Sequence, residues 1–320
     1  MPDVLPTRTP ADDQALVDDV DEPMRAHFQP EAAPRPDVAI GNELHLRLWR
    51  HPAPRKPRLL FLHGYLDTGR SWDAVCARLD GAFDCTALTW RGHGESERVG
   101  RGGSAHLMDH LKDLTGVVLR AAEDGRPYDG IVAHSMGANI ALMWAGAFSE
   151  HDVDLLLVDG LGPPAEPAAD QPERWHTLLS AVGKHKPFRP AARVADAVDR
   201  LCKLNPKLTH QGAARMLRHA LVPVDDGFAF PFDGRLRGVT PVRFEETTWT
   251  ACCRRVRGRV HVIRADNGYV PDDTDERVSS RLAALRASIE TLADAGHHLH
   301  VDAPDVLADR IRGFFGGGDA

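Results

Sequence analysis

The sequence predicts an α/β fold in which helices cover both faces of a mostly parallel sheet, and three observations support this fold class. Short apolar runs typical of buried strands alternate with segments whose apolar residues recur every three or four positions, as in helices. The alternation stops at about Leu161 and resumes near residue 258, which indicates an insertion into the sheet-forming chain. One apolar run ends at a lone serine, Ser135, where a helical pattern begins.

The first part of the chain predicts a hairpin followed by strands and helices in turn. Residues 37–51 alternate apolar and polar positions around a Gly-Asn pair, which is typical of a hairpin. Residues 58–64 (RLLFLHG) are a continuous apolar run ending in glycine, as in a strand buried on both faces. We expect a helix with Ser71 as its N-cap, then a strand over residues 83–90 and a helix over residues 104–125.

The same pattern continues on both sides of the insertion. The stretch YDGIVAHSMGANIALMWAG, residues 128–146, combines a short apolar strand with a helix, and residues 153–160 (VDLLLVDG) predict another strand. After the insertion the predicted elements are strands over residues 258–266 and 288–294 and helices over residues 274–286 and 304–315.

These elements divide the chain into a sheet-forming core and an inserted segment. The insertion is helical and punctuated by prolines, and it would lie over the C-terminal edge of the sheet, where open α/β sheets bind ligands. The first residues are rich in Pro, Asp and Ala, which predicts poor order. The expected parts are an N-terminal extension (1–36), a core (37–161 and 258–316), a mainly helical cap (162–257) and a flexible tail (317–320).

Composition argues against several classes of protein. The 320 residues carry a net charge of −7, whereas a nucleic-acid surface normally needs a basic footprint. No apolar run reaches the ~18 residues needed to span a bilayer. The N-terminus has no basic segment followed by an apolar one, so we expect a cytoplasmic protein without a secretory signal. Five cysteines without a CxxC pair or metal-ligand spacing suit a reducing compartment.

The serine lies in a sequence suited to a very tight turn. Residues 133–137, Ala-His-Ser-Met-Gly, have the form G-x-S-x-G with alanine in the first glycine position. Such a turn requires small residues two before and two after the serine, and it holds the serine in a strained conformation. The helix that begins there directs free N–H groups toward the same point, which favours negative charge on a reacting oxygen.

Together these patterns resemble the α/β-hydrolase superfamily, in the subgroup of serine hydrolases with a helical cap after the sixth strand. The resemblance covers about residues 37–316 and rests on LHGYLDTGRSW, RGHGES, AHSMGA, LVDGLGPP and AGHHLHVDAP in the family's order. It implies that Ser135 is the nucleophile and that the backbone N–H groups of Tyr65 and Met136 form the oxyanion hole. The RGHGES loop is expected to be structural.

The resemblance also implies a histidine base near the C-terminus. His297, His298 and His300 compete for this role, and His297 fits the pattern Gly-His followed by an acid two residues before a proline. His298 falls where a large aromatic residue is common, and His300 is expected to be structural. His297 would take the Ser135 proton and pass it to the leaving group.

The acid of the predicted triad has two candidates. Most relatives place it after the seventh strand, but the sequence RADNGYVP puts Asn267 at that position, with Asp266 before it. Asp159, at the end of the sixth strand, is the alternative. We prefer Asp266, because a one-residue shift of the loop would bring it to the histidine. A carboxylate is favoured over Asn267 because it stabilises the imidazolium.

The expected reaction is attack of Ser135 on an ester, thioester or related acyl bond of a small molecule, as in a carboxylic ester hydrolase. Hydrolysis of a C–C bond, perhydrolase or lyase chemistry with the same triad, and non-catalytic ligand binding stay open. A serine at the turn argues against dehalogenase and epoxide hydrolase chemistry, which need a carboxylate. We expect no cofactor and no metal. A homodimer is left open. The residues expected to line the substrate site are His134, Trp175 and Leu179.

Overall fold

The structure, a computed structural model, describes residues 35–41, 44–100, 103–184, 187–238 and 240–317, together with Ala15, Leu16 and Asp19. Nearly all of the predicted N-terminal extension lies outside the described residues, as does the predicted tail beyond Gly317. Within the described ranges, no helix combines the length and the apolar composition needed to cross a bilayer.

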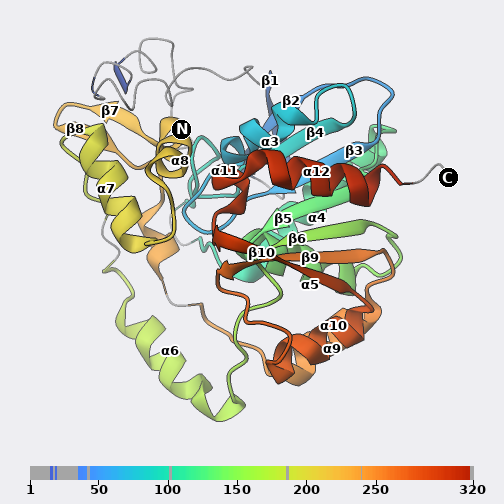
Figure 1. The fold of residues 1–320 in the computed structure, drawn as a ribbon. Helices are drawn as coiled ribbons and strands as arrows, with labels where there is room; N and C mark the ends of the chain where they lie inside the picture. Colours follow the sequence, from blue (N-terminus) through green and yellow to red (C-terminus); the bar gives the residue numbers. More distant parts are fainter. Residues whose placement is uncertain are drawn as a thin grey trace.

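An eight-stranded sheet forms the centre of the molecule, in the order β1-β2-β4-β3-β5-β6-β9-β10 (Figure 1). β1 and β2 pair antiparallel as the predicted hairpin, and β2 is antiparallel to β4. All the remaining pairs are parallel, which confirms the predicted mostly parallel sheet. The strands are β1 Arg35–Gly41, β2 Leu44–His51, β3 Arg58–Leu62, β4 Asp84–Leu88, β5 Gly130–His134, β6 Asp154–Val158, β9 Val260–Asn267 and β10 Ser288–Gly296.

The central strands are mostly apolar because both of their faces are covered. All five residues of β3 and of β5 are buried. Alternate residues point to opposite faces of the sheet, so Leu60 and Ile131 belong to one hydrophobic cluster while Phe61 and Val132 belong to another. This explains why the sequence shows continuous apolar runs here rather than alternation.

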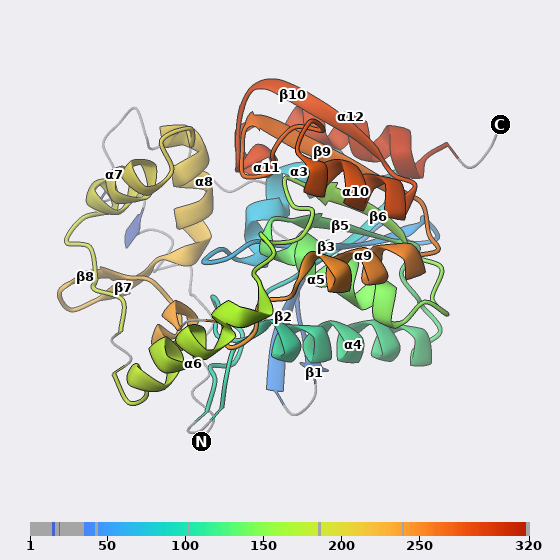
Figure 2. The same cartoon turned by 90° about the horizontal axis from the view of Figure 1, so that it is seen from below.

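Helices of the predicted core cover the two faces. α4 and α5 lie on one face, whereas α3 and α12 lie on the other (Figure 2). Their amphipathic faces supply the buried side chains of the two clusters, which is why the helical periodicity was visible in the sequence. These helices are α3 Asp73–Arg78, α4 Leu107–Glu123, α5 Met136–Ala147, α10 Glu276–Leu285, α11 Leu299–Asp302 and α12 Pro304–Phe315.

Ser71 does not cap α3 as predicted. The helix begins at Asp73 and is preceded by the 3-10 helix η2, Gly69–Trp72, which contains the serine. The Ser71 hydroxyl instead donates to the buried carboxylate of Asp67, with an oxygen–oxygen distance of 2.8 Å. A charged acceptor holds the hydroxyl more strongly than a neutral one does, so the tertiary partner decides its role.

The segment between β6 and β9 contains the predicted inserted helices. α7 and α8 pack on each other around a separate hydrophobic cluster, and α6 extends away from the sheet (Figure 1). Its elements are η3 Ala168–Asp170, α6 Gln171–Ser180, α7 Val194–Leu204, α8 His210–Ala220, β7 Val222–Val224, β8 Gly227–Ala229, η4 Gly234–Arg237 and α9 Glu246–Arg255.

α9 differs from the predicted boundary of this insertion. Its Trp249 and Cys253 are buried in the same hydrophobic cluster as α4 and α5, and the helix packs between α5 and α10. The sheet-forming core therefore resumes before residue 246 rather than at residue 258. An amphipathic helix has the same sequence pattern whichever body it packs on, so the pattern alone could not place this boundary.

Candidate active site

The predicted turn between strand and helix is present at Ser135. This residue follows β5 and precedes α5, with φ of 52° and ψ of −116°, a conformation that is strained for any residue other than glycine. A Cβ atom on Gly137 would lie 2.7 Å from the carbonyl oxygens of Leu62 and His63, and one on Gly160 would lie 2.7 Å from the Ser135 carbonyl oxygen. Close backbone packing on both sides therefore holds the turn.

His297 lies against this serine. The residue follows β10, and its Nε2 is 2.9 Å from Ser135 Oγ, although the two residues are 162 positions apart in the sequence. This distance is within hydrogen-bond reach, so the imidazole can accept the hydroxyl proton. Of the three predicted candidates, the structure brings His297 to the serine.

The other ring nitrogen of His297 faces Asp159. Nδ1 of His297 is 2.5 Å from Oδ2 of this carboxylate, which is buried at the end of β6. The backbone N–H of Tyr269 donates to the same oxygen at 2.8 Å, and that of Ala265 donates to Oδ1 at 3.2 Å. A Cβ on Gly268 would lie 2.2 Å from Oδ2. The loop after β9 thus encloses the carboxylate and fixes its orientation.

The preference for Asp266 as the partner of His297 is corrected by this geometry. β9 continues through Asn267, and Asp266 is exposed at its edge rather than turned toward the histidine. Its carboxylate accepts the N–H groups of Asp294 and Ala295, at 2.9 and 3.0 Å, where the pairing of β10 with β9 is irregular. Asp266 thus supports the bend of β10, and Asp159 occupies the position expected for the acid.

The two residues predicted for the oxyanion hole lie on either side of the serine turn. Met136 is the first residue of α5, where backbone N–H groups have no acceptor within the helix. Gly64 packs so closely that its Cβ would be 3.2 Å from the Ser135 Cβ, and this contact places the turn containing Tyr65 beside the serine. Tyr65 and Met136 line the same cavity of about 340 Å³.

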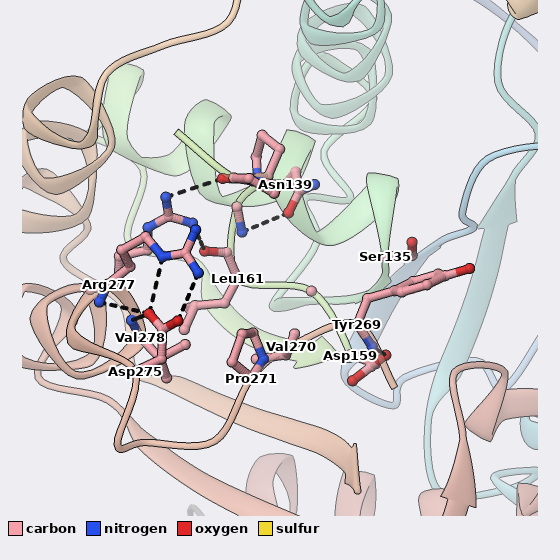
Figure 3. Close-up of a pocket in the computed structure, with 15 residues that line it drawn as sticks. Ser135, Asn139, Asp159, Leu161, Tyr269, Val270, Pro271, Asp275, Arg277 and Val278 are labelled. Carbon is pink, nitrogen blue, oxygen red and sulfur yellow. Dashed lines mark hydrogen bonds and ion pairs between the residues drawn. The ribbon is translucent and has the colours of Figure 1, made fainter. Parts of the chain in front are cut away.

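A second cavity, of about 280 Å³, is lined by Ser135 itself (Figure 3). Ser135, Asp159 and Tyr269 lie at one end of it, and Asp275 and Arg277 at the other. Both cavities are also lined by Asn139 and Pro163, so they adjoin at the serine turn.

Arg281 holds the wall of the second cavity. It is buried, its guanidinium group pairs with Glu246 of α9, and it donates to the carbonyl oxygens of Leu161 and Pro163 at 2.8 and 3.1 Å. Asn139 accepts the N–H of Gly162 at 2.7 Å from the opposite side. The chain leaving β6 is therefore fixed where it passes the serine.

The predicted substrate-lining residues lie elsewhere. His134 is buried behind the serine turn, and its Nε2 donates to the carbonyl oxygen of His297 at 2.8 Å. Trp175 and Leu179 lie on α6 with 48% and 67% of their surface exposed, and neither lines the two cavities beside Ser135. The indole of Trp175 donates to the carbonyl oxygen of Pro241 instead. The structure therefore places none of these three side chains in the two cavities beside Ser135, and their contact with substrate stays a prediction.

Sequence reasoning missed two residues beside the serine. The ring of Tyr269 lies 4.2 Å from that of His297, between centroids, and covers it on the solvent side. Asn139 lies one helical turn after Ser135, and the sequence MGAN gives no signal of its link to Gly162. For Tyr269 the sequence NGYVP did contain a signal, because this aromatic residue closely follows the loop position expected for the acid.

The neighbouring histidines are not placed to act as the base. Burial, together with the neighbouring His300 and His297, lowers the pKa of His298 to about 3. His300 is fully buried and donates from Nε2 to Asp67. In the RGHGES loop, burial and the neighbouring His63 lower the pKa of His93 to about 3, and its Nδ1 donates to the carbonyl oxygen of Arg91. His298 and His93 are therefore neutral, and all three rings belong to the interior of the protein.

Comparison with known proteins agrees with this fold. The model of the alpha/beta hydrolase family matches residues 59–310. A serine hydrolase-like protein of Danio rerio is 23% identical over 285 residues, 85% of each chain. The crystal structure of the hypothetical protein PA1622 of Pseudomonas aeruginosa PAO1 superposes with a TM-score of 0.79 at 27% identity and covers 88% of this chain and 99% of that one.

A thioesterase domain from the curacin biosynthetic pathway has the same fold, with a TM-score of 0.72, 22% identity and coverage of 87% of this chain and 99% of that domain. The family match and the serine hydrolase-like relatives support a hydrolase activity. Since the matched region spans most of the sequence, the chain belongs to the alpha/beta hydrolase family.

Proposed function

We propose that the protein is a serine hydrolase that cleaves an ester, thioester or related acyl bond of a small molecule through Ser135, His297 and Asp159. The observation that carries the proposal is the continuous hydrogen-bonded line from the Ser135 hydroxyl through both nitrogens of His297 to the buried Asp159 carboxylate. This is the arrangement that activates a serine hydroxyl in acyl transfer.

The proposed reaction has two halves. His297 Nε2 removes the Ser135 proton as Oγ attacks the acyl carbonyl carbon, and the imidazolium then protonates the leaving group. Water enters, gives its proton to His297 and attacks the acyl-enzyme, and the serine leaves with that proton. The N–H groups of Tyr65 and Met136 would stabilise the negative oxygen in both halves, each worth about 10²–10³ in rate.

The two cavities suggest how a substrate is held. We propose that the acyl group and the leaving group occupy the cavity beside Tyr269 and the cavity beside Tyr65, with the scissile carbonyl at Ser135 between them. Together the two spaces suit a small molecule rather than a polymer. The wall of the cavity beside Tyr65 includes Leu236 and Phe244, so the segment between β6 and α9 would act as the predicted cap.

A fluorophosphonate probe tests the nucleophile directly. We expect stoichiometric labelling that mass spectrometry maps to Ser135 and that is absent from Ser135→Ala protein. A panel of p-nitrophenyl and thioester substrates of graded acyl length then defines the acyl group, with Ser135→Ala as the control. Folded wild-type protein that neither reacts with the probe nor hydrolyses any substrate, yet binds a small ligand, would instead indicate a non-catalytic binding protein.

A further inference from the structure

A second group of ionisable side chains lies behind the serine turn, and the proposed reaction does not use it. Asp67 follows the oxyanion turn, His134 precedes the serine, and His300 lies in α11. All three are buried, with at most 2% of their surface exposed. One oxygen or nitrogen atom from each lies within 4.8 Å of those from the other two, a separation that side chains can close around a metal ion.

The carboxylate of Asp67 is a buried charge with an unusual partner. Its two oxygens accept hydrogen bonds from the backbone N–H of Thr68 and from the Ser71 hydroxyl, each at 2.8 Å. Its ion-pair partner within the described part of the chain is His300, with 3.1 Å from Oδ2 to Nε2, rather than a lysine or arginine. A buried carboxylate requires a positive charge nearby.

Each histidine of the group has one ring nitrogen without a hydrogen-bond partner among the described residues. His134 donates from Nε2 to the His297 carbonyl, so its Nδ1 carries a lone pair, and this buried atom has no hydrogen-bond partner among the described residues. Nδ1 of His300 is equally buried and unpartnered. An imidazole binds metals through a ring nitrogen that has a free lone pair.

We propose that Asp67, His134 and His300 form a binding site for a zinc-class divalent ion, with Zn²⁺ or Co²⁺ as ligand. Two imidazoles and one carboxylate are a common zinc ligand set, with bonds of about 2.0–2.2 Å. The 3.1 Å between Asp67 Oδ2 and His300 Nε2 is close to the ligand spacing such bonds require. The proton on His300 Nε2 must leave that atom when metal binds, either to its own bare Nδ1 or to solvent.

The surroundings supply the support and the access that such a site needs. The N–H of Thr68 and the Ser71 hydroxyl each lie 2.8 Å from a carboxylate oxygen of Asp67 and hold it in place. Such outer contacts fix the orientation of a ligand. A cavity of about 80 Å³, lined mostly by apolar side chains and by Arg200, reaches Asp67 from α7 and α8.

Occupation of the site would affect the catalytic histidine. His134 Nε2 holds the backbone carbonyl of His297, and drawing the His134 ring toward an ion breaks that contact. The loop carrying the base would then shift away from Ser135, so metal binding would slow hydrolysis. This consequence for the rate rests on the proposed function, whereas metal binding itself does not.

The test titrates the metal-free full chain with ZnCl₂ against a chromogenic chelator and with CoCl₂ by visible absorption. We expect one ion per chain and the intense absorption of four-coordinate Co²⁺. Asp67→Asn and His300→Gln should each weaken binding by about tenfold or more. Circular dichroism checks that each variant is folded. If one variant does not fold, metal binding by the other variant is compared with that of the wild type.

Two controls separate this site from other histidines. Ser135→Ala and His297→Ala should bind the ion as wild type does, so that binding is measured without hydrolysis. His210→Gln removes an exposed histidine that pairs with Asp199 and should also leave binding unchanged. Absence of binding to wild type, or its loss in His297→Ala or His210→Gln, overturns the proposal. Binding without slower ester hydrolysis would refute only the effect on the base.

Discussion

Replacement of Asp159 by asparagine tests the position of the acid. In the structure its carboxylate accepts three N–H groups, from His297, Tyr269 and Ala265. The amide of Asp159→Asn keeps the shape but has one oxygen and one NH₂ group. Wherever its oxygen points, at least one of the three donors faces the NH₂ group instead.

The cost of this change can be divided into stability and rate. One buried N–H group left without an acceptor should lower the free energy of unfolding by about 1–3 kcal/mol. Loss of the carboxylate leaves the imidazolium uncompensated and favours the wrong tautomer, and in a serine triad this lowers kcat by about 10⁴. At about 1.4 kcal/mol for each factor of ten, the barrier rises by about 5.5 kcal/mol.

The matched control is Asp266→Asn. Asp266 is exposed and accepts hydrogen bonds from the bend of β10 and from the Asn267 side chain, so kcat should change by less than about threefold. Hydrolysis of a p-nitrophenyl ester at saturating substrate measures both variants, with urea unfolding as the stability assay. If Asp159→Asn keeps more than a tenth of wild-type kcat while Asp266→Asn loses activity, the assignment of the acid is wrong.

Three further outcomes follow from packing and burial. Gly137→Ala would place its Cβ 2.7 Å from two carbonyl oxygens and should lower the free energy of unfolding by about 1–3 kcal/mol in urea titration, whereas Gly313→Ala, in α12 with open space around it, should raise it by about 0.5–1 kcal/mol. Burial lowers the pKa of His63 to about 4 and that of His93 to about 3, so the unfolded chain binds protons first as the pH falls below 6.5. Above pH 6.5 both rings are neutral in the folded and in the unfolded chain, so they do not lower the free energy of unfolding. Between pH 6.5 and pH 4 the free energy of unfolding decreases by about 1.4 kcal/mol per pH unit for each histidine. Equal unfolding free energies at pH 7 and pH 5 would contradict this. Leu179→Ala should leave kcat/KM for every ester in the panel within about twofold, since this exposed side chain lines neither cavity beside Ser135, and a larger change would show that α6 contacts substrate.

Most of the sheet and its helices could be predicted because burial produces a hydrophobic pattern in the local sequence. β3 and β5 are covered on both faces and read as unbroken apolar runs, and α4 has one apolar side. What could not be predicted depends on partners distant in the sequence. Ser71 turned to Asp67 instead of capping a helix, and α9 packed on α5 instead of on the inserted helices.

The residues of the site also divide into those that the local sequence predicts and those that it does not. Ser135 could be located because its turn demands small neighbours at fixed positions, and His297 because of its spacing from Pro304. The acid that pairs with His297 could not be predicted, because Asp159 and Asp266 both lie at the end of a strand and differ only in the direction of the side chain. β9 extends further than the sequence pattern indicated, and this turned Asp266 to solvent.

The placement of Asp159 directly after β6 has a consequence for redesign of the protein. Where the acid belongs to the loop after β9, that loop cannot be exchanged without dismantling the chemistry. In this chain the end of β9 and the loop after it contact the Asp159 carboxylate through backbone at Ala265, Gly268 and Tyr269, while Val270, Pro271 and Asp275 line the cavity. Grafting other sequences onto residues 270–275 could therefore alter which molecules are accepted and leave the proton-transfer apparatus untouched.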